Sequence, residues 1–132
     1  LQAHKMGGFE KEKAAEMLFH LKGISVEIID VKTLLPFDIN HVIFKSIKKT
    51  NKVIFVDEDV PGGATAFMMQ KVLDEQKVFN YLDAVPRTLP AKDHRPAYGI
   101  DGEYFSKPHM EQIFETVYDI MRETDIKRFP PL

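Results

Sequence analysis

The residues best suited to chemistry form a short acidic turn that contains Asp57, Glu58 and Asp59. The turn follows the apolar run Val-Ile-Phe-Val at 53–56 and leads through Gly62 and Gly63 into a helical pattern. In an open α/β sheet, ligands collect at the carboxyl ends of the strands, which is where this turn would lie. Carboxylate oxygens there could hold a magnesium ion, and glycines at a helix N-terminus could cradle a phosphate.

The surrounding sequence favours a structural role for this turn. Adjacent side chains at a strand end diverge, and no further carboxylate cluster joins the three acids. The acids would repel a phosphate, and the sequence lacks both GxGxxG and the lysine of GxxxxGK[ST]. We therefore expect the acids to offset the helix dipole and the turn to serve in a subunit contact. A stand-alone magnesium-dependent phosphatase-like domain that uses Asp57 and Asp59 stays open as an alternative.

No other grouping of residue types predicts a catalytic site. The chain has no cysteine, which excludes a disulfide framework, a thiolate metal site and a cysteine nucleophile. Its five histidines form neither HxxxH nor HExxH, and no serine stands in a GxSxG context. The cluster Asp93-His94-Arg95 lies in a long loop and is explained equally well by a solvated surface. The sequence thus predicts no catalytic residue, no metal ligand and no cofactor-binding residue.

The elements that would position the turn alternate between helices and strands. Spacing and residue type predict helices over 9–22, 38–49, 64–76 and 109–123, strands over 25–31, 53–56 and 85–89, a loop over 90–108 and a tail over 124–132. Lys11 falls among the wet-face residues of the first helix, and Gly23 is its predicted C-cap. The apolar strand at 53–56 is typical of a parallel sheet covered on both faces, and Pro86 confines the last strand to an edge or else must be the first residue of that strand. We predict an α/β fold, a three-layer α/β/α sandwich with a mostly parallel sheet.

Length and composition restrict the class of protein further. The 132 residues, 44% of them hydrophobic, predict a single domain over 1–132. With 18 basic and 20 acidic residues, the net charge of −2 argues against nucleic acid or an anionic membrane as a partner. No apolar run approaches the ~20 residues that a membrane span needs. We expect protein partners and a cytoplasmic location.

Three stretches of the sequence resemble one known family. The run Gly-Ile-Ser-Val-Glu-Ile-Ile-Asp-Val-Lys-Thr-Leu-Leu-Pro-Phe-Asp at 23–38 resembles a motif of the C-terminal transketolase-like domain. This domain is shared by the β subunits of 2-oxoacid dehydrogenases, by transketolase relatives and by deoxyxylulose-phosphate synthases. The acidic strand end at 56–59 with its two glycines is similar to the family's own turn. The run Phe-Asn-Tyr-Leu-Asp-Ala-Val-Pro-Arg at 79–87 is similar to a segment typical of the dehydrogenase β subunits, and Pro96-Ala97-Tyr98 lies where those subunits carry a related motif.

The resemblance implies the decarboxylating component of a 2-oxoacid dehydrogenase, an oxidoreductase of a multienzyme complex that uses thiamin diphosphate and magnesium. It also implies that this domain binds no cofactor itself, since in such enzymes the cofactor lies between two other domains. The C-terminal domain packs subunits together, in a dimer in the full enzyme, and helps dock the lipoyl-bearing acyltransferase core.

On this resemblance, two groups of residues are expected to contact partners. Those expected in a subunit contact are Glu58, Asp59, Gly62, Gly63 and Phe67. Those expected to dock the acyltransferase lie on the exposed face of the last helix and in the tail: Glu111, Glu115, Asp119 and Arg128.

Two departures from the family pattern keep alternatives open. The family domain begins with an apolar strand, whereas residues 1–8 read Leu-Gln-Ala-His-Lys-Met-Gly-Gly, which is a poor strand. The loop over 96–108 is longer than the usual connection. A transketolase or deoxyxylulose-phosphate synthase C-terminal domain would share the fold and cofactor but lack an acyltransferase partner, and the run at 79–87 disfavours it.

Overall fold

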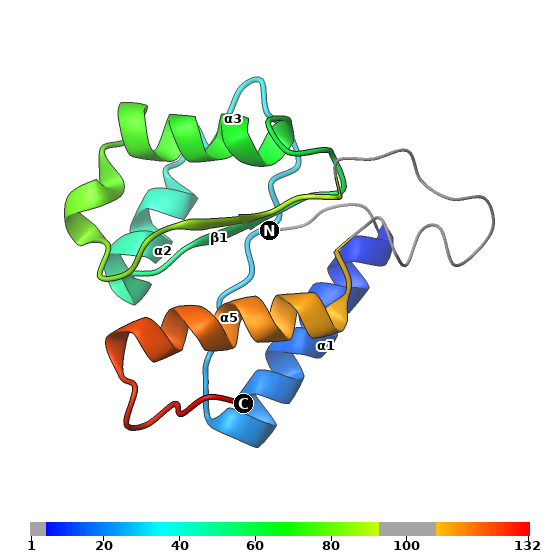
Figure 1. Ribbon diagram of the computed structural model, residues 1–132. Coiled ribbons are helices and arrows are strands. Elements are labelled where there is room, and N and C mark those ends of the chain that lie inside the picture. The colour runs from blue at the N-terminus through cyan, green and yellow to red at the C-terminus, as the bar shows by residue number, and fades with distance from the viewer. Residues whose placement is uncertain (1–4, 93–107) are drawn as a thin grey trace.

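The computed structural model describes residues 5–92 and 108–132, with side chains from Lys11 onward. In chain order its elements are α1 (Lys5–Lys22), α2 (Val42–Thr50), β1 (Ile54–Val56), α3 (Ala64–Gln70), the π-helical η1 (Lys71–Glu75), the 3-10 helix η2 (Val78–Tyr81), β2 (Arg87–Leu89) and α5 (Met110–Thr124). Helix α3 lies on one side of the two strands, and α5 lies on the other beside α1 (Figure 1). The predicted α/β class and the predicted parallel pairing of strands are confirmed.

The sheet consists of β1 and β2 in parallel, with Ile54 opposite Arg87. Arg87 N–H donates to the carbonyl of Val53 at 3.2 Å, and Asp57 N–H donates to the carbonyl of Leu89 at 3.3 Å. Because alternate residues of a parallel strand bond to opposite neighbours, the peptide groups of Ile54 and Val56 point away from β2. β2 begins directly after Pro86, so this proline lies just outside the strand.

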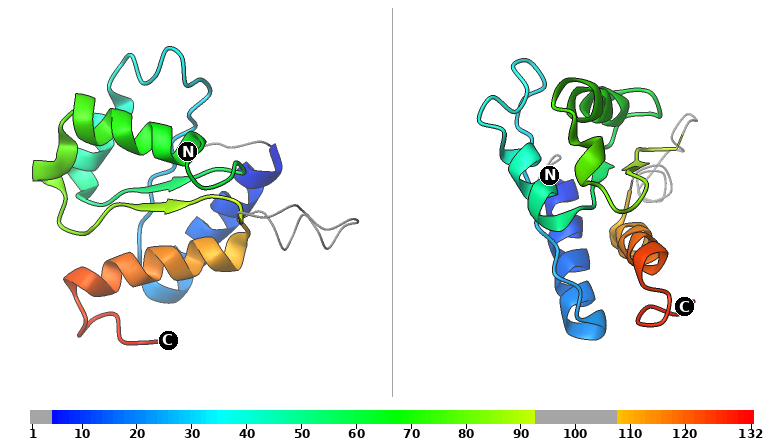
Figure 2. Two further views of the ribbon diagram at one scale, coloured as in Figure 1. Left: turned by 45° about the horizontal axis from the view of Figure 1, so that its top comes forward. Right: turned by 90° about the vertical axis from the view of Figure 1, so that its left-hand side faces the viewer.

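The strand predicted at 25–31 is wrong. No backbone hydrogen bond joins residues 25–29 to β1. Figures 1 and 2 show this segment rising from the end of α1 and running across the direction of the strands. β-branched residues favour an extended backbone, but a strand also needs a neighbour that runs alongside it, and the crossing removes that neighbour.

Two clusters of buried side chains form most of the core. The first surrounds Phe55 and joins α2, β1, α3, η1 and η2: Ile43, Ile47, Phe55, Met68, Val72 and Val78. The second joins α1, the segment after it, α5 and the tail: Leu18, Ile24, Tyr118 and Phe129. A smaller cluster of Ala14, Val56 and Ile113 lies between α1, β1 and α5.

Local signals in the sequence explain where several helices begin and end. Gly23 has φ of 68° and ends α1, with its N–H donating to the carbonyl of Phe19 at 3.1 Å. His41 occupies the N-cap position of α2, and the carboxylate of Asp38 accepts the N–H of Val42, the first residue of the helix, at 2.9 Å. The helix predicted over 64–76 is confirmed as a helical stretch, but its second half is π-helical. The Asp93-His94-Arg95 cluster and the Pro96-Ala97-Tyr98 motif lie outside the described residues.

Candidate functional site

The acidic turn after β1 is closed by its own hydrogen bonds. Asp57 Oδ1 accepts the N–H of Asp59 at 2.8 Å, and Asp59 Oδ1 accepts the N–H of Val60 at 2.9 Å. The N–H of Gly63 donates to the carbonyl of Val60 at 3.0 Å, and the N–H of Ala91 donates to the carbonyl of Asp59 at 2.8 Å. The carboxylates of Asp57 and Asp59 therefore shape the backbone of the turn, and the backbone carbonyl of Asp59 ties it to the chain that follows β2.

Backbone geometry explains why both of these positions in the turn are glycines. Gly62 has φ of 88°, a left-handed conformation that side chains disfavour. A Cβ on Gly63 would collide with the carboxylate of Asp59. The two glycines thus let α3 begin close behind the acids.

Lys11 reaches this region from α1, which corrects its assignment to the wet face of the helix. Its side chain is only 4% exposed, and burial lowers its pKa to about 8, although the negative charges of Asp57, Asp30 and Glu58 act to raise it. The helical spacing of Lys11 with Ala14 and Leu18, both fully buried, was the signal that could have revealed this. A buried amine therefore accompanies the acidic end of β1.

The predicted subunit-contact residues lie in and just after the turn. Glu58 and Gly63 are half-buried, whereas Asp59 and Gly62 are exposed. Phe67 is half-buried one turn into α3, edge-to-face with Phe37 at 6.3 Å between ring centroids. The structure therefore brings all five residues to the β1–α3 junction.

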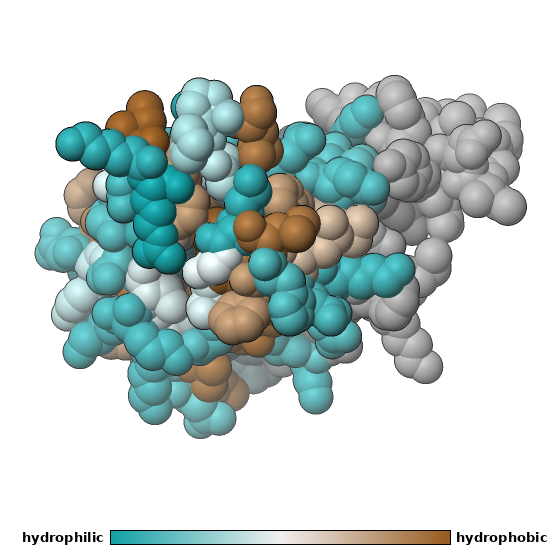
Figure 3. All heavy atoms as spheres, turned by 90° about the horizontal axis from the view of Figure 1, so that it is seen from below, coloured by the Kyte–Doolittle hydropathy of each residue, from teal (hydrophilic) through white to brown (hydrophobic). Residues whose placement is uncertain are grey.

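The predicted docking residues share a surface of α5 and the tail. Glu111, Glu115 and Asp119 are exposed at intervals of four residues, so they follow one face of α5. Arg128 is exposed on the tail, and its guanidinium lies 5.1 Å from the ring of Phe129. Seen from the side of α5, the surface is mostly hydrophilic with separate apolar side chains (Figure 3).

The tail is held against α5 by a buried aromatic contact. Phe129 is 3% exposed and packs edge-to-face on Tyr118, with 5.8 Å between ring centroids. Tyr118 Oη donates to the carbonyl of Pro130 at 2.6 Å. This anchoring fixes the backbone beside Arg128.

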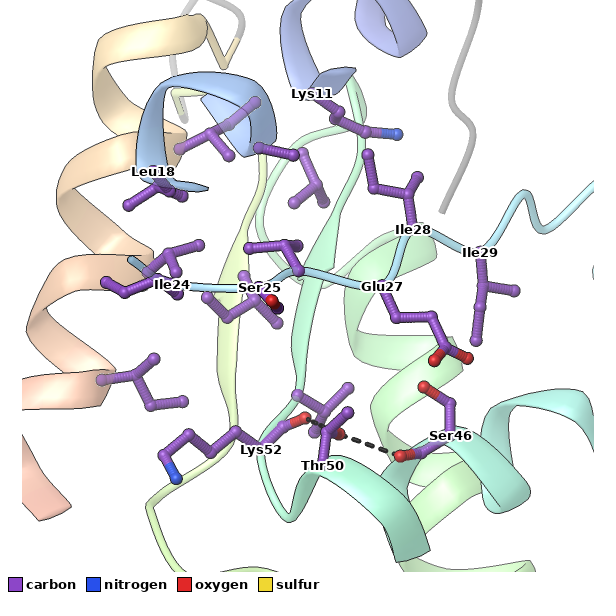
Figure 4. Close-up of a pocket in the computed structure, with 18 of the residues that line it drawn as sticks. Lys11, Leu18, Ile24, Ser25, Glu27, Ile28, Ile29, Ser46, Thr50 and Lys52 are labelled. Carbon is purple, nitrogen blue, oxygen red and sulfur yellow. Dashed lines mark hydrogen bonds between the residues drawn. The ribbon is translucent and has the colours of Figure 1, made fainter. Parts of the chain in front are cut away.

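A groove of about 310 Å³ lies between β1 and the crossing segment 24–29 (Figure 4). Lys11, Ala15 and Leu18 of α1 line it, as do residues of α2 and α5. The sequence did not reveal this groove, because it arises from the crossing of segment 24–29 over the strand direction.

Metal ligands and membrane-spanning helices were both sought among the described residues. Within 5–92 and 108–132 there is no group of three or more His, Cys, Asp or Glu side chains that could hold a metal ion. Among the helices of the same residues, none has the length and apolar character needed to cross a bilayer.

The chain matches one known protein family over most of its length. Residues 8–108 match the family described as "Transketolase, C-terminal domain". Because the match covers most of the chain, this chain belongs to the transketolase C-terminal domain family.

Within that family, the chain is similar to β subunits of pyruvate dehydrogenase. It is 35% identical over 106 residues to "Pyruvate dehydrogenase E1 component subunit beta" of Rhizobium meliloti (strain 1021), covering 80% of this chain and 22% of the relative. It is 32% identical over 110 residues to the mitochondrial β subunit of Saccharomyces cerevisiae, a match that covers 83% of this chain and 30% of the relative. It is 36% identical over 110 residues to the mitochondrial β subunit of Pisum sativum, a match that covers 83% of this chain and 29% of the relative. The chain thus spans less than a third of the length of these relatives.

Proposed function

We propose that this domain is a non-catalytic assembly and docking domain of a 2-oxoacid dehydrogenase decarboxylating component. The observation that carries the proposal is its similarity, at 32–36% identity over most of the chain, to pyruvate dehydrogenase β subunits. The hydrogen bonds that turn the carboxylates of Asp57 and Asp59 onto their own backbone support a structural role for this turn. The names of these relatives favour a dehydrogenase over a transketolase or deoxyxylulose-phosphate synthase.

The proposal assigns the chemistry to other parts of a longer enzyme. Thiamin diphosphate and magnesium would supply the decarboxylation there. The carboxylates at the β1–α3 junction are poorly suited to binding magnesium, since the described residues contain no group of three side chains that could hold a metal ion. Helices lie on both sides of the two strands (Figure 1), which supports a three-layer α/β/α sandwich for this domain in the full enzyme.

The proposed partners are a second subunit and the lipoyl-bearing acyltransferase core. The junction of Glu58, Asp59, Gly62, Gly63 and Phe67 would contact the subunit in a dimer of the full enzyme. The relatives' names divide between mitochondrial, chloroplastic and unspecified locations, so the cytoplasmic location stays a prediction.

The acidic face of α5 would dock the acyltransferase by charge. Glu115 and Asp119 are both exposed, and Asp119 borders a polar hollow with Arg87 and Arg122. A basic surface on the partner would fit this face, since complementary charges favour association.

Titration calorimetry of the chain with the subunit-binding domain of the cognate acyltransferase tests this docking. We expect saturable binding, weakened at least about tenfold by the double substitution E115K/D119K, because like charges at a docked surface cost several kcal/mol. The matched control, D74K/E75K, makes the same charge change at two exposed positions beyond α3 and should bind like the native chain. Absence of heat with folded protein, or equal loss in both variants, would contradict the docking role.

A further inference from the structure

A polar hollow of about 700 Å³, open to solvent, lies between β2 and the C-terminal half of α5. Two cationic and two anionic side chains line it: Arg87, Asp119, Arg122 and Glu123. Because the opposite charges are equal in number, the way in which they pair decides what the hollow can bind.

Two of these four groups neutralise each other across the hollow. Nη2 of Arg87, on β2, forms an ion pair with Oε1 of Glu123, on α5. Within 5–92 and 108–132, no hydrogen bond or ion pair joins Arg122 to another residue, and its buried Nε has no acceptor. Since buried N–H groups normally have a partner, Arg122 is the group in this hollow that lacks one.

The guanidinium group of Arg122 is suited to a carboxylate, whose two oxygens match its planar fork of donors. A free anion in the hollow would also meet the negative charges of Asp119 and Glu123. An acidic side chain on a protein would instead be held there by the rest of an interface. Ile126, which is 66% exposed and lines the same hollow, offers such a protein apolar area to bury.

We propose that Arg122 binds an acidic side chain of the acyltransferase partner, while basic side chains of that partner face Glu115 and Asp119. This inference rests on the proposed docking function and deepens it, because it adds a contact of opposite sign to the same surface. Asp119 and Arg122 lie three residues apart on α5, so one partner surface can contact both. The alternation of charge fixes how the partner is oriented, since like charges brought together oppose other arrangements.

Removal of the charge of Arg122 distinguishes this contact from general attraction between an acidic face and a basic partner. General attraction predicts that Arg122→Gln leaves binding unchanged or strengthens it. The proposed contact predicts binding weaker by at least about tenfold, because the partner's carboxylate is left without its cation. Titration calorimetry with the subunit-binding domain of the cognate acyltransferase measures the change. The matched control Lys45→Gln removes a positive charge from an exposed position of α2 and should bind like the native chain.

The native chain separates failure of this contact from failure of the docking function. If the native chain does not bind, the docking function is wrong and this inference falls with it. If the native chain binds and Arg122→Gln binds equally or more tightly, the inference is overturned while the docking function stands. Equal weakening by Arg122→Gln and Lys45→Gln also overturns it.

Substitutions in the partner identify the acidic side chain. Each exposed Asp or Glu of the subunit-binding domain is changed to Asn or Gln and titrated against the native chain and against Arg122→Gln. We expect one position whose substitution weakens native binding at least about tenfold but changes binding to Arg122→Gln by less than about twofold. If no position shows this coupling, the inference is overturned. Arg122→Lys, which keeps the charge but not the guanidinium, replaces Arg122→Gln if that variant does not fold.

Inorganic phosphate tests a free anion as the occupant. Thermal unfolding is followed in phosphate and in sodium chloride of equal ionic strength, for the native chain and for Arg122→Gln. Under the proposal, the difference between the two salts is the same in both proteins. A stabilisation by phosphate that Arg122→Gln abolishes would overturn a protein side chain as the occupant.

Discussion

The ammonium group of Lys11 gives up most of its hydration when the chain folds. Its side chain is 4% exposed beside the acidic end of β1, and burial outweighs the attraction of Asp57, Asp30 and Glu58 in setting its pKa near 8. A lysine whose pKa falls on folding destabilises the native state as long as it stays protonated. The position therefore weakens the domain at neutral pH.

Replacement of this lysine by methionine should change how stability depends on pH. Between pH of about 8 and the ordinary pKa of 10.5, the unfolded chain binds the proton while the folded chain has released it. The native free energy of unfolding should thus rise across this window, by up to about 3 kcal/mol at ~1.4 kcal/mol per pKa unit. Urea titrations from pH 7 to 10.5 should show this rise in the native chain and not in Lys11→Met.

The control for this prediction is Lys45→Met, at an exposed position of α2. It should keep the native pH profile, because the side chain of Lys45 stays in solvent when the chain folds. Identical profiles for the two variants would contradict the link between stability and the burial of Lys11.

The backbone conformation of Gly62 limits which residues can replace it. Gly62→Ala should lower the free energy of unfolding by about 1–2 kcal/mol, since a Cβ at φ of 88° is strained whatever space surrounds it. Val60→Ala, at an exposed position of the same turn, should change stability by no more than about 0.5 kcal/mol. Chemical denaturation of both variants measures the difference, and equal effects would show that the backbone conformation is not the cause.

At the scale of elements, the contact between α5 and the tail gives a further prediction. Phe129→Ala should cost about 3–5 kcal/mol, because it empties a site enclosed by Tyr118, Leu18 and Ile24. Phe79→Ala removes the same side chain at a position that is 70% exposed and should cost less than about 0.5 kcal/mol. Thermal or urea unfolding distinguishes them, and a small loss for Phe129→Ala would mean that the tail adds little to the core.

Sequence signals located the helices better than the strands. Residues at helix ends such as Gly23 and Asp38 act within a few residues of themselves, so their effects can be predicted locally. The run at 25–31 has the composition of a strand, but whether it pairs depends on which segment lies next to it. The same reason explains why the groove beside β1 could not be predicted from the sequence.

Some side-chain positions at the candidate sites could also be predicted from local spacing, and others could not. The spacing of Glu111, Glu115 and Asp119 predicts one exposed helix face, and the structure places them there. The charge of Lys11 wrongly predicts a solvent-facing position, because its helical neighbours Ala14 and Leu18 on that face are buried. Identity of a side chain alone is a weaker guide to burial than its position in the helical repeat.

At the scale of the whole molecule, the groove represents a considerable deficit in packing. Residues of both main clusters line it, with Leu18 and Ile24 from one and Ile43 and Ile47 from the other. The groove is partly open to solvent, so it separates the two clusters without forming a sealed cavity.

The separation of the two main clusters has a consequence for how the molecule opens. All members of the cluster around Phe55 lie between residues 43 and 78, whereas the cluster around Tyr118 joins residues 18–24 to residues 118–129. Ala14, Val56 and Ile113 form the smaller cluster between these two parts. Regions with few shared apolar contacts tend to unfold as separate cooperative units. Amide protons of α1 and α5 should therefore exchange with solvent as one group, with a free energy of opening distinct from that of α2, α3 and β1.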